Sequence, residues 1–337
     1  MRCVSRKPRR AQLVATLLIH MAALAGCSAQ ESQALRIGTS SIGSTFYGLA
    51  VAISELIQEH ENLNSTVEPV GGSVANVFAL DTNRIDLAVV NAFATFSGFN
   101  GIREFDKPVA IRLVMQGQFT YRHLLVRKSA NIVSPADLVG KTIIGERPAN
   151  PDFVLIMDEL IRVYGLPRDE IRIVSTTNTS EALRALRVGS VDGALLPFSA
   201  GSALVQQALN DDLLEFLVFP LDKRDQILRN LPAAIQGTTI KGGTFINQER
   251  DIPTFSLATQ LVARRDVPEE TVYRVLTVLL EHHAEFVTYQ SAAREWTLER
   301  TLSEAALPYH DGAIRYFREH GLWNAELAST QELLAPD

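Results

Sequence analysis

The chain has 337 residues, 46% of them apolar and 21% charged, which is enough apolar sequence to bury a sizeable core and excludes a disordered chain. Its formal net charge is −6. Without the five basic residues of segment 1–10, 27 Lys and Arg remain against 38 Asp and Glu, a net charge of −11 that excludes nucleic acid and anionic lipid surfaces as expected partners.

The N-terminus predicts a signal peptide over residues 1–26. Five basic residues precede an apolar run over 11–25, which is too short for a comfortable membrane span. The run ends in "LAGC", which resembles a bacterial lipobox, so we expect Cys27 to become the lipidated first residue of a periplasmic chain. An ordinary cleavage site near a cysteine is the alternative. Either membrane of the periplasm is compatible with this signal.

The mature chain is then expected to begin with a polar tether over residues 27–34. Because Cys3 leaves with the signal, Cys27 is the single mature cysteine. The sequence therefore excludes an intrachain disulfide and a thiolate nucleophile.

Segment 36–57, "RIGTSSIGSTFYGLAVAISELI", predicts a strand, a turn of small residues and an amphipathic helix. Free N–H groups at such a helix start bind anions. The spacing of Gly38, Gly43 and Thr45 also matches a phosphate loop, but Ser44 replaces the lysine that contacts nucleotide phosphates. Two alternatives stay open beside the nucleotide: a small anion, or a plain helix cap without ligand.

Two stretches of the chain resemble each other at a constant offset. "ALDTNRIDLAVV" at 79–90 matches "ALRVGSVDGALL" at 185–196 and pairs Asp86 with Asp192, for which we predict structural roles. The same offset pairs residues 66–76 with residues 172–182. These matches predict two similar β-α-β-α-β lobes.

The predicted strands end in small polar residues, at 39–45, 71–73 and Asn91 in the first half and at 176–180 in the second. In open α/β sheets a ligand lies beyond the carboxyl ends of the strands. The sequence therefore predicts a cleft for a small, polar, anionic ligand.

Other chemistry does not assemble in the sequence. His282 and His283 are neighbours on a helix predicted over 272–286, and no carboxylate or Cys four residues away completes a zinc set. No G-x-S-x-G motif indicates a serine hydrolase. We expect no enzyme activity, no cofactor and no metal.

The ordered set of motifs resembles the TAXI class of extracytoplasmic receptors of TRAP (tripartite ATP-independent periplasmic) transporters. The matching segments are "RIGTSSIGSTFYGLA", "VEPVGGSVANVFALDTNRIDLAVVNA", "ADLVGKTIIG", the return crossing at 240–282 and "LPYHDGAIRYFREHGLW". Together they span about residues 35–323.

This resemblance implies an α/β, two-lobed, periplasmic-binding-protein-like fold of the second type, with the ligand cleft between the lobes. Lobe 1 is expected at 35–121 plus 258–337 and lobe 2 at 122–257, with hinge segments at 119–129 and 254–266. A TAXI receptor binds a small carboxylate-bearing solute, such as a glutamate-like amino acid or organic acid. It delivers the solute to TRAP membrane permease subunits driven by an ion gradient.

The resemblance also suggests the ligand contacts, residue by residue. The expected ligand-binding residues are Gly43, Thr45, Tyr47, Gly72, Ser73, Asn76 and Asn91.

The sequence departs from the family at three places. "ERPANPDF" replaces a glycine-rich turn, Asn91 stands where Gln is common and Phe245 where Tyr is frequent. Arg147 offers a bidentate carboxylate clamp in compensation, the alternative being a solvated surface arginine.

Two other functions stay open from the sequence. A lipoprotein sensor or adaptor would bind solute and contact a membrane kinase. A periplasmic lipoprotein enzyme is the third reading, although no nucleophile and base can be named for it.

Overall fold

A computed structural model describes residues 1, 34–200, 202–303 and 305–334. Apart from its first residue, the predicted signal peptide lies outside this range, as do Cys27 and all but the last residue of the tether. Within it, no helix has both the length and the apolar character needed to cross a membrane.

The helices alternate with the strands along most of the chain. In the described part of the chain, four short 3-10 helices, η1 to η4, span Lys128–Ala130, Pro135–Leu138, Arg168–Glu170 and Ser291–Glu295. The α-helices are α2 (Thr45–Glu61), α3 (Ser73–Asp81), α4 (Ala92–Asn100), α5 (Asp152–Tyr164), α6 (Thr179–Val188), α7 (Ala203–Asn210), α8 (Leu221–Leu228), α9 (Glu269–Glu281), α10 (His283–Tyr289), α11 (Leu298–Leu302), α12 (Asp311–Glu319) and α13 (Ala325–Leu334).

Ten strands form one mixed sheet in the order β2-β1-β3-β10-β4-β7-β5-β6, with β8 paired to β4 and β9 to β10. Read from each edge inward, the two halves follow one pattern, since β6-β5-β7-β4 repeats β2-β1-β3-β10. The strands are β1 (Leu35–Thr39), β2 (Ser65–Pro69), β3 (Leu87–Asn91), β4 (Ile111–Arg127), β5 (Thr142–Glu146), β6 (Arg172–Ser175), β7 (Gly193–Phe198), β8 (Leu214–Phe216), β9 (Gln236–Ile240) and β10 (Ile252–Arg264). This α/β architecture is the fold expected from the sequence.

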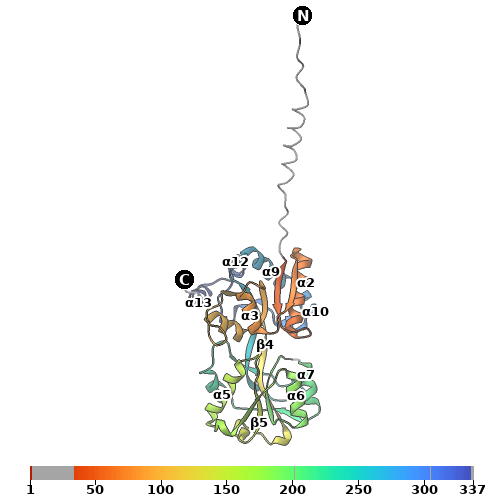
Figure 1. Cartoon of the computed structure of the whole chain (residues 1–337), viewed down its shortest axis with the longest axis vertical. Coiled ribbons are helices and arrows are strands. Elements are labelled where there is room, and N and C mark those ends of the chain that lie inside the picture. The colour runs from red at the N-terminus through yellow and green to blue at the C-terminus, as the bar shows by residue number, and fades with distance from the viewer. Residues whose placement is uncertain (2–33, 201, 304, 335–337) are drawn as a thin grey trace. The chain divides into compact units, whose positions relative to one another are not determined.

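The long strands β4 and β10 are antiparallel neighbours at the centre of the sheet. In Figure 1, β4 runs from the end of the fold that carries α2, α3 and α9 toward the end that carries α5 and α6. Both expected crossing segments are strands, but β4 begins at Ile111, eight residues before the expected start at 119. The apolar stretch Ile111–Met115 extends it because its side chains are almost all buried in the core.

The strand register brings the two halves together at one stretch of β10. Strand β3 ends with Asn91 opposite Thr259, while β7 ends with Phe198 opposite Tyr121, which itself faces Ser256 on β10. Both strands run antiparallel to their crossing partner, so their carboxyl ends approach each other. On β10 the two ends lie at Thr259 and Ser256, three residues apart, which is about 10 Å along the strand.

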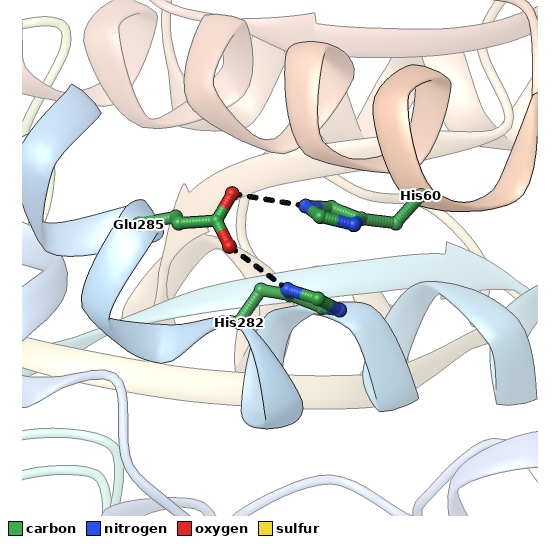
Figure 2. Close-up of side chains that lie close together, drawn as sticks. All are labelled: His60, His282 and Glu285. Carbon is green, nitrogen blue, oxygen red and sulfur yellow. Dashed lines mark hydrogen bonds and ion pairs between the residues drawn. The ribbon is translucent and has the colours of Figure 1, made fainter.

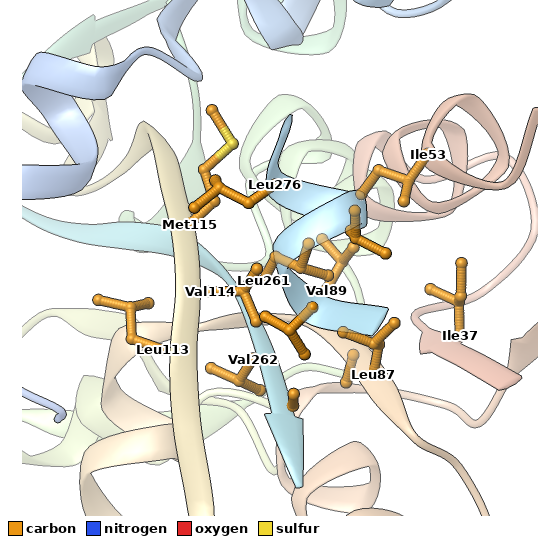
Figure 3. Packing of buried hydrophobic residues seen from close by; sticks show 14 of the residues in the cluster. Ile37, Ile53, Leu87, Val89, Leu113, Val114, Met115, Leu261, Val262 and Leu276 are labelled. Atoms are coloured by element: carbon orange, nitrogen blue, oxygen red, sulfur yellow. The ribbon is translucent and has the colours of Figure 1, made fainter. Parts of the chain in front are cut away.

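Buried apolar residues form three clusters. One joins β1–β3 and α2 to α9 and α12, and Figure 3 shows its centre around Val89, Leu261 and Leu276. The second cluster surrounds Phe153 and Leu195 and includes Ala92 and Phe93 of α4. The third is made of residues between 125 and 252. The first and third clusters therefore each lie within one half of the sheet, whereas the second also receives side chains from α4 of the first half.

The helix predicted over 272–286 is two helices. Helix α9 ends at Glu281, and α10 begins at His283. The break falls at His282, whose backbone (φ −103°, ψ 30°) departs from helical values.

Candidate ligand-binding site

Helix α3 begins without a side-chain cap. Its N-cap is Gly72 with φ 149°, preceded by Gly71 with φ 117°, both in backbone regions that favour glycine. A Cβ on either glycine would meet nothing within 4 Å, so backbone conformation and not crowding requires glycine here. Among the described residues, the amides of Ser73, Val74 and Ala75 have no hydrogen-bond partner. They leave spare donors at the end of β2.

Three of the predicted site residues hold this loop together. The Ser73 hydroxyl accepts a hydrogen bond from the Asn91 amide at 3.1 Å, and the Asn91 side chain caps α4 by accepting from Ala94 at 2.9 Å. The Asn76 amide group donates to the carbonyls of Thr39 (3.0 Å) and Gly72 (2.7 Å). Asn76 has no exposed surface, so in this conformation it supports the loop from beneath and does not line the surface.

The opening loop has a different arrangement. Ser44 is the N-cap of α2, and its hydroxyl accepts from the Tyr47 amide at 3.1 Å, so the helix-cap interpretation holds for this residue. Gly43 (φ 84°) and Thr45 are exposed, and Tyr47 is half-buried. The amides of Thr45 and Phe46 have no partner within the described residues, which leaves them available to an anion.

Arg147 follows β5 and lies in a cluster of buried charge. Its Nη1 donates to the Thr179 hydroxyl at 3.2 Å at the start of α6, while its buried Nε has no partner among the described residues. Burial lowers the pKa of Arg147, the neighbouring Arg122 lowers it further, and Asp152 opposes both. Because Arg122 and Asp152 are fully buried and paired at 2.5 Å, Arg147 leaves this cluster with one uncompensated positive charge.

The first turn of helix α6 contains the carboxylate of Glu181, which is bound by residues of the preceding loop. Asn178 caps the helix by accepting from the Glu181 amide at 2.9 Å. The Glu181 carboxylate accepts from the Thr177 hydroxyl, the Thr177 amide and the Thr176 hydroxyl, and these bonds lower its pKa. A hollow of about 530 Å³ opens here and is lined by Thr177, Asn178, Ser180, Glu181 and Arg184. This half of the sheet thus presents a polar hollow beside which the Thr176 and Thr177 hydroxyls already donate to Glu181.

Polar side chains also lie in the middle of the crossing strands. Gln118 accepts from the Trp296 indole at 2.5 Å, but its buried Nε2 has no partner within the described chain. The hydroxyls of Thr120, Ser256 and Thr259 are buried and equally unpaired there. These groups lie on the stretch where the ends of β3 and β7 meet. They can satisfy a polar ligand or ordered water, since buried polar atoms of this kind rarely stay unpaired.

A family model covers residues 37–321, which is most of the chain, and it describes the NMT1-like family. The chain belongs to the NMT1-like family.

Two solved structures share the fold. The PhnD1 protein of Prochlorococcus marinus, in complex with methylphosphonate, is 11% identical with a TM-score of 0.56, covering 86% of this chain and 99% of that one. MatC from Rhodopseudomonas palustris, with bound malate, is 14% identical with a TM-score of 0.52, covering 90% and 99%. Both have the two-lobed α/β fold, which confirms the fold class expected from the sequence.

In this NMT1-like chain the predicted site residues fall into three groups. Hydrogen bonds join Asn76 to Gly72 and Asn91 to Ser73, and the two pairs belong to one loop because Gly72 and Ser73 are consecutive. Gly43, Thr45 and Tyr47 form the separate opening loop. Arg147 lies on the other half of the sheet, and no hydrogen bond between described residues joins it to either group.

Sequence reasoning missed the buried pair Arg122–Asp152 and the polar centre of the crossing strands. The one available signal was the run "QGQFTYR" at 116–122, where polar residues interrupt an otherwise apolar strand. Asp152 gave no signal, because its partner lies 30 residues away in the sequence.

Proposed function

We propose that this NMT1-like chain is a periplasmic solute-binding protein, not an enzyme, and that it closes over a small carboxylate-bearing anion. The observation that carries the proposal is the meeting of β3 and β7 at residues 256–259 of β10. Helix α3, whose first residue Ser73 contacts Asn91 at the end of β3, has amides without a partner in the described chain. Buried hydroxyls of the crossing strands are likewise unpaired there. Two proteins of the same fold were solved with the anions methylphosphonate and malate.

The expected binding residues have distinct tasks in this proposal. Amides at the starts of α2 and α3 donate to one carboxylate, with Gly43 and Gly72 setting the backbone and Thr45 and Ser73 adding hydroxyls. Tyr47 covers an apolar part of the solute. Arg147 supplies the charge from the other lobe, while Asn76 and Asn91 hold the loops in place.

The two lobes proposed are 35–121 with 258–337, and 122–257. Two of the apolar clusters support this division, since one lies entirely within the first lobe and one entirely within the second. The remaining cluster belongs mainly to the second lobe and also contains Ala92 and Phe93 of α4. Strands β4 and β10 are then the hinge, and closure brings Arg147 toward the amides of α3.

The partners of this proposal follow from the resemblance to TAXI receptors. The protein is held at a periplasmic membrane through lipidated Cys27 and delivers its solute to TRAP permease subunits. The proposal of a carboxylate ligand rests on the amides of α2 and α3 and on Arg147. The proposal of TRAP permease subunits as partners rests on the sequence motifs alone.

Thermal-shift screening tests the function. Dicarboxylates, oxo acids, acidic amino acids, phosphonates and alkyl sulfonates are each added to the purified chain, because a ligand bound only to the native state raises the melting temperature. We expect a saturable rise with a small carboxylate and none with its methyl ester. A response confined to phosphonates or sulfonates would overturn the proposal that the ligand is a carboxylate. No response to any anion would overturn the proposed anion-binding site. Turnover of the bound solute would make the protein an enzyme.

A further inference from the structure

Two histidines and one glutamate meet on a solvent-accessible face of α2, α9 and α10. Figure 2 shows His60, at the end of α2, beside His282, which separates α9 from α10, with the Glu285 carboxylate at the edge of both rings. His60 Nε2 lies 3.0 Å from one carboxylate oxygen, and His282 Nδ1 lies 3.0 Å from the other. All three side chains retain some exposure, between 22% and 47%, so an ion can reach them.

The two imidazole rings are stacked, with centroids 3.4 Å apart and planes inclined by 20°. Stacking places a nitrogen of each ring on the same side, and one ligand atom from each of the three residues lies within 4.8 Å of the others. Two imidazole nitrogens and one carboxylate oxygen form a donor set common in zinc and other transition-metal sites, where the protein supplies three ligands and water fills the remaining positions.

We propose that His60, His282 and Glu285 bind a divalent transition-metal ion, with zinc as the reference ion. Metal–nitrogen bonds of about 2.0–2.1 Å require the two rings to tilt toward a common point. A rotation of each exposed ring about its Cβ–Cγ bond supplies this tilt. The two ring nitrogens that face the carboxylate give up their protons to the other nitrogen of the ring or to solvent, since a nitrogen must be deprotonated to bind the ion. The carboxylate then exchanges its two hydrogen bonds for one bond to the ion.

The ion would act as a brace and not as a participant in solute binding. It would tie the end of α2 to the junction of α9 and α10, segments 225 residues apart in sequence. Those elements already meet nearby, where the Tyr289 hydroxyl donates to Glu59 at 3.3 Å. Thr45 lies 15 residues earlier on α2, about 22 Å along the helix, so the brace is separate from the proposed solute site.

Zinc binding to the purified chain, without a polyhistidine tag, tests the proposal by isothermal titration at neutral pH. We expect one zinc ion per chain and a rise in melting temperature of about 5 °C at a hundredfold excess over Kd. A chelator should reverse the rise. Calcium and magnesium should give no rise, because these ions prefer sites built from oxygen ligands.

Three variants locate the ion: His60→Gln, His282→Gln and Glu285→Gln, each expected to weaken zinc binding about tenfold or more. His283→Gln is the matched control. His283 is the next residue in the chain, but its ring lies 2.9 Å from the Ala293 carbonyl and takes no part in the cluster. Circular dichroism confirms that each variant is folded. Equal zinc affinity in the parent and the three variants, or no saturable binding below about millimolar zinc, would overturn the proposal.

Discussion

Asp86 and Asp192 make equivalent bonds in the two halves of the sheet. Asp86 accepts from the Arg36 amide at the start of β1 (2.9 Å), and Asp192 accepts from the Thr142 amide at the start of β5 (2.9 Å). Each also pairs with an arginine at the end of a crossing strand: Arg264 with Asp86 at 3.4 Å, and Arg127 with Asp192 at 2.7 Å. The structural role predicted for both residues is confirmed. The internal repeat seen in the sequence is matched by equivalent hydrogen bonds in the two halves.

Replacing these carboxylates should weaken the fold mainly above acidic pH. Burial acts to raise the pKa of Asp86, but Arg36 and Arg264 outweigh it, so the pKa lies below its ordinary 3.8. Burial is likewise outweighed at Asp192 by Thr142 and Arg127. A carboxylate with a lowered native pKa stabilises the fold above its unfolded pKa and loses this contribution as pH falls through the native value.

Asp86→Asn is therefore expected to lower the free energy of unfolding by about 2–3 kcal/mol at pH 7, with a smaller cost for Asp192→Asn. The difference from the parent should shrink as pH falls below about 4. Urea unfolding at several pH values measures it. Asp158→Asn is the control, since its pair with Arg168 is exposed at 3.7 Å and should change stability by under about 0.5 kcal/mol. A cost that stays constant down to pH 2 would contradict the electrostatic explanation.

Arg147→Met separates ligand binding from stability. The substitution removes a positive charge that faces Arg122, so the ligand-free protein should melt at the same temperature or higher. Affinity for the anionic solute should fall about tenfold or more, because a charge-assisted hydrogen bond is lost. Calorimetry of both proteins measures the two effects, with the exposed Arg172→Met as control. Unchanged affinity would place Arg147 outside the site.

Gly72→Ala tests the loop before α3. Alanine avoids φ 149°, so the loop should shift or carry strain of about 1–3 kcal/mol, and the hydrogen bond from Asn76 to the Gly72 carbonyl should weaken. We expect reduced stability together with a reduced thermal shift by solute. Gly140→Ala is the control for backbone strain, because it introduces strain at another positive φ, 77°, in the turn before β5. If both variants keep full solute affinity, the α3 amides do not bind it.

Features set by local sequence were predictable. The pattern of strand, small-residue turn and amphipathic helix over residues 36–57 predicts β1 and α2, and both are confirmed. The offset between Asp86 and Asp192 could be found because each lobe encodes the same order of strand, turn and helix within a short segment. The expected hinge segments also located the crossing strands, although not the start of β4.

Features made by distant residues were not predictable from one sequence. The sequence offered His282 no partner four residues away, because its neighbour His60 lies on another helix. The break between α9 and α10 has no proline or glycine to mark it. Asp152 read as part of a proline-rich turn, while its buried partner Arg122 belongs to a crossing strand. Such contacts depend on tertiary packing, which the local pattern does not contain.

His123 should make the fold sensitive to mild acid. Its ring is buried in β4, 2.9 Å from the Thr254 hydroxyl and 2.8 Å from the Leu217 carbonyl, and stacks on Phe219. Burial lowers its pKa to about 4, whereas the unfolded residue titrates near 6.5. The unfolded chain therefore binds the proton first, and stability should fall by about 3 kcal/mol between pH 6.5 and 4. A titration of His123 followed by nuclear magnetic resonance should place the midpoint of its protonation near pH 4. His123→Gln should flatten this part of the stability curve, leaving the slope contributed by His310, whose pKa burial also lowers. An unchanged slope in that variant would assign the acid sensitivity to other groups.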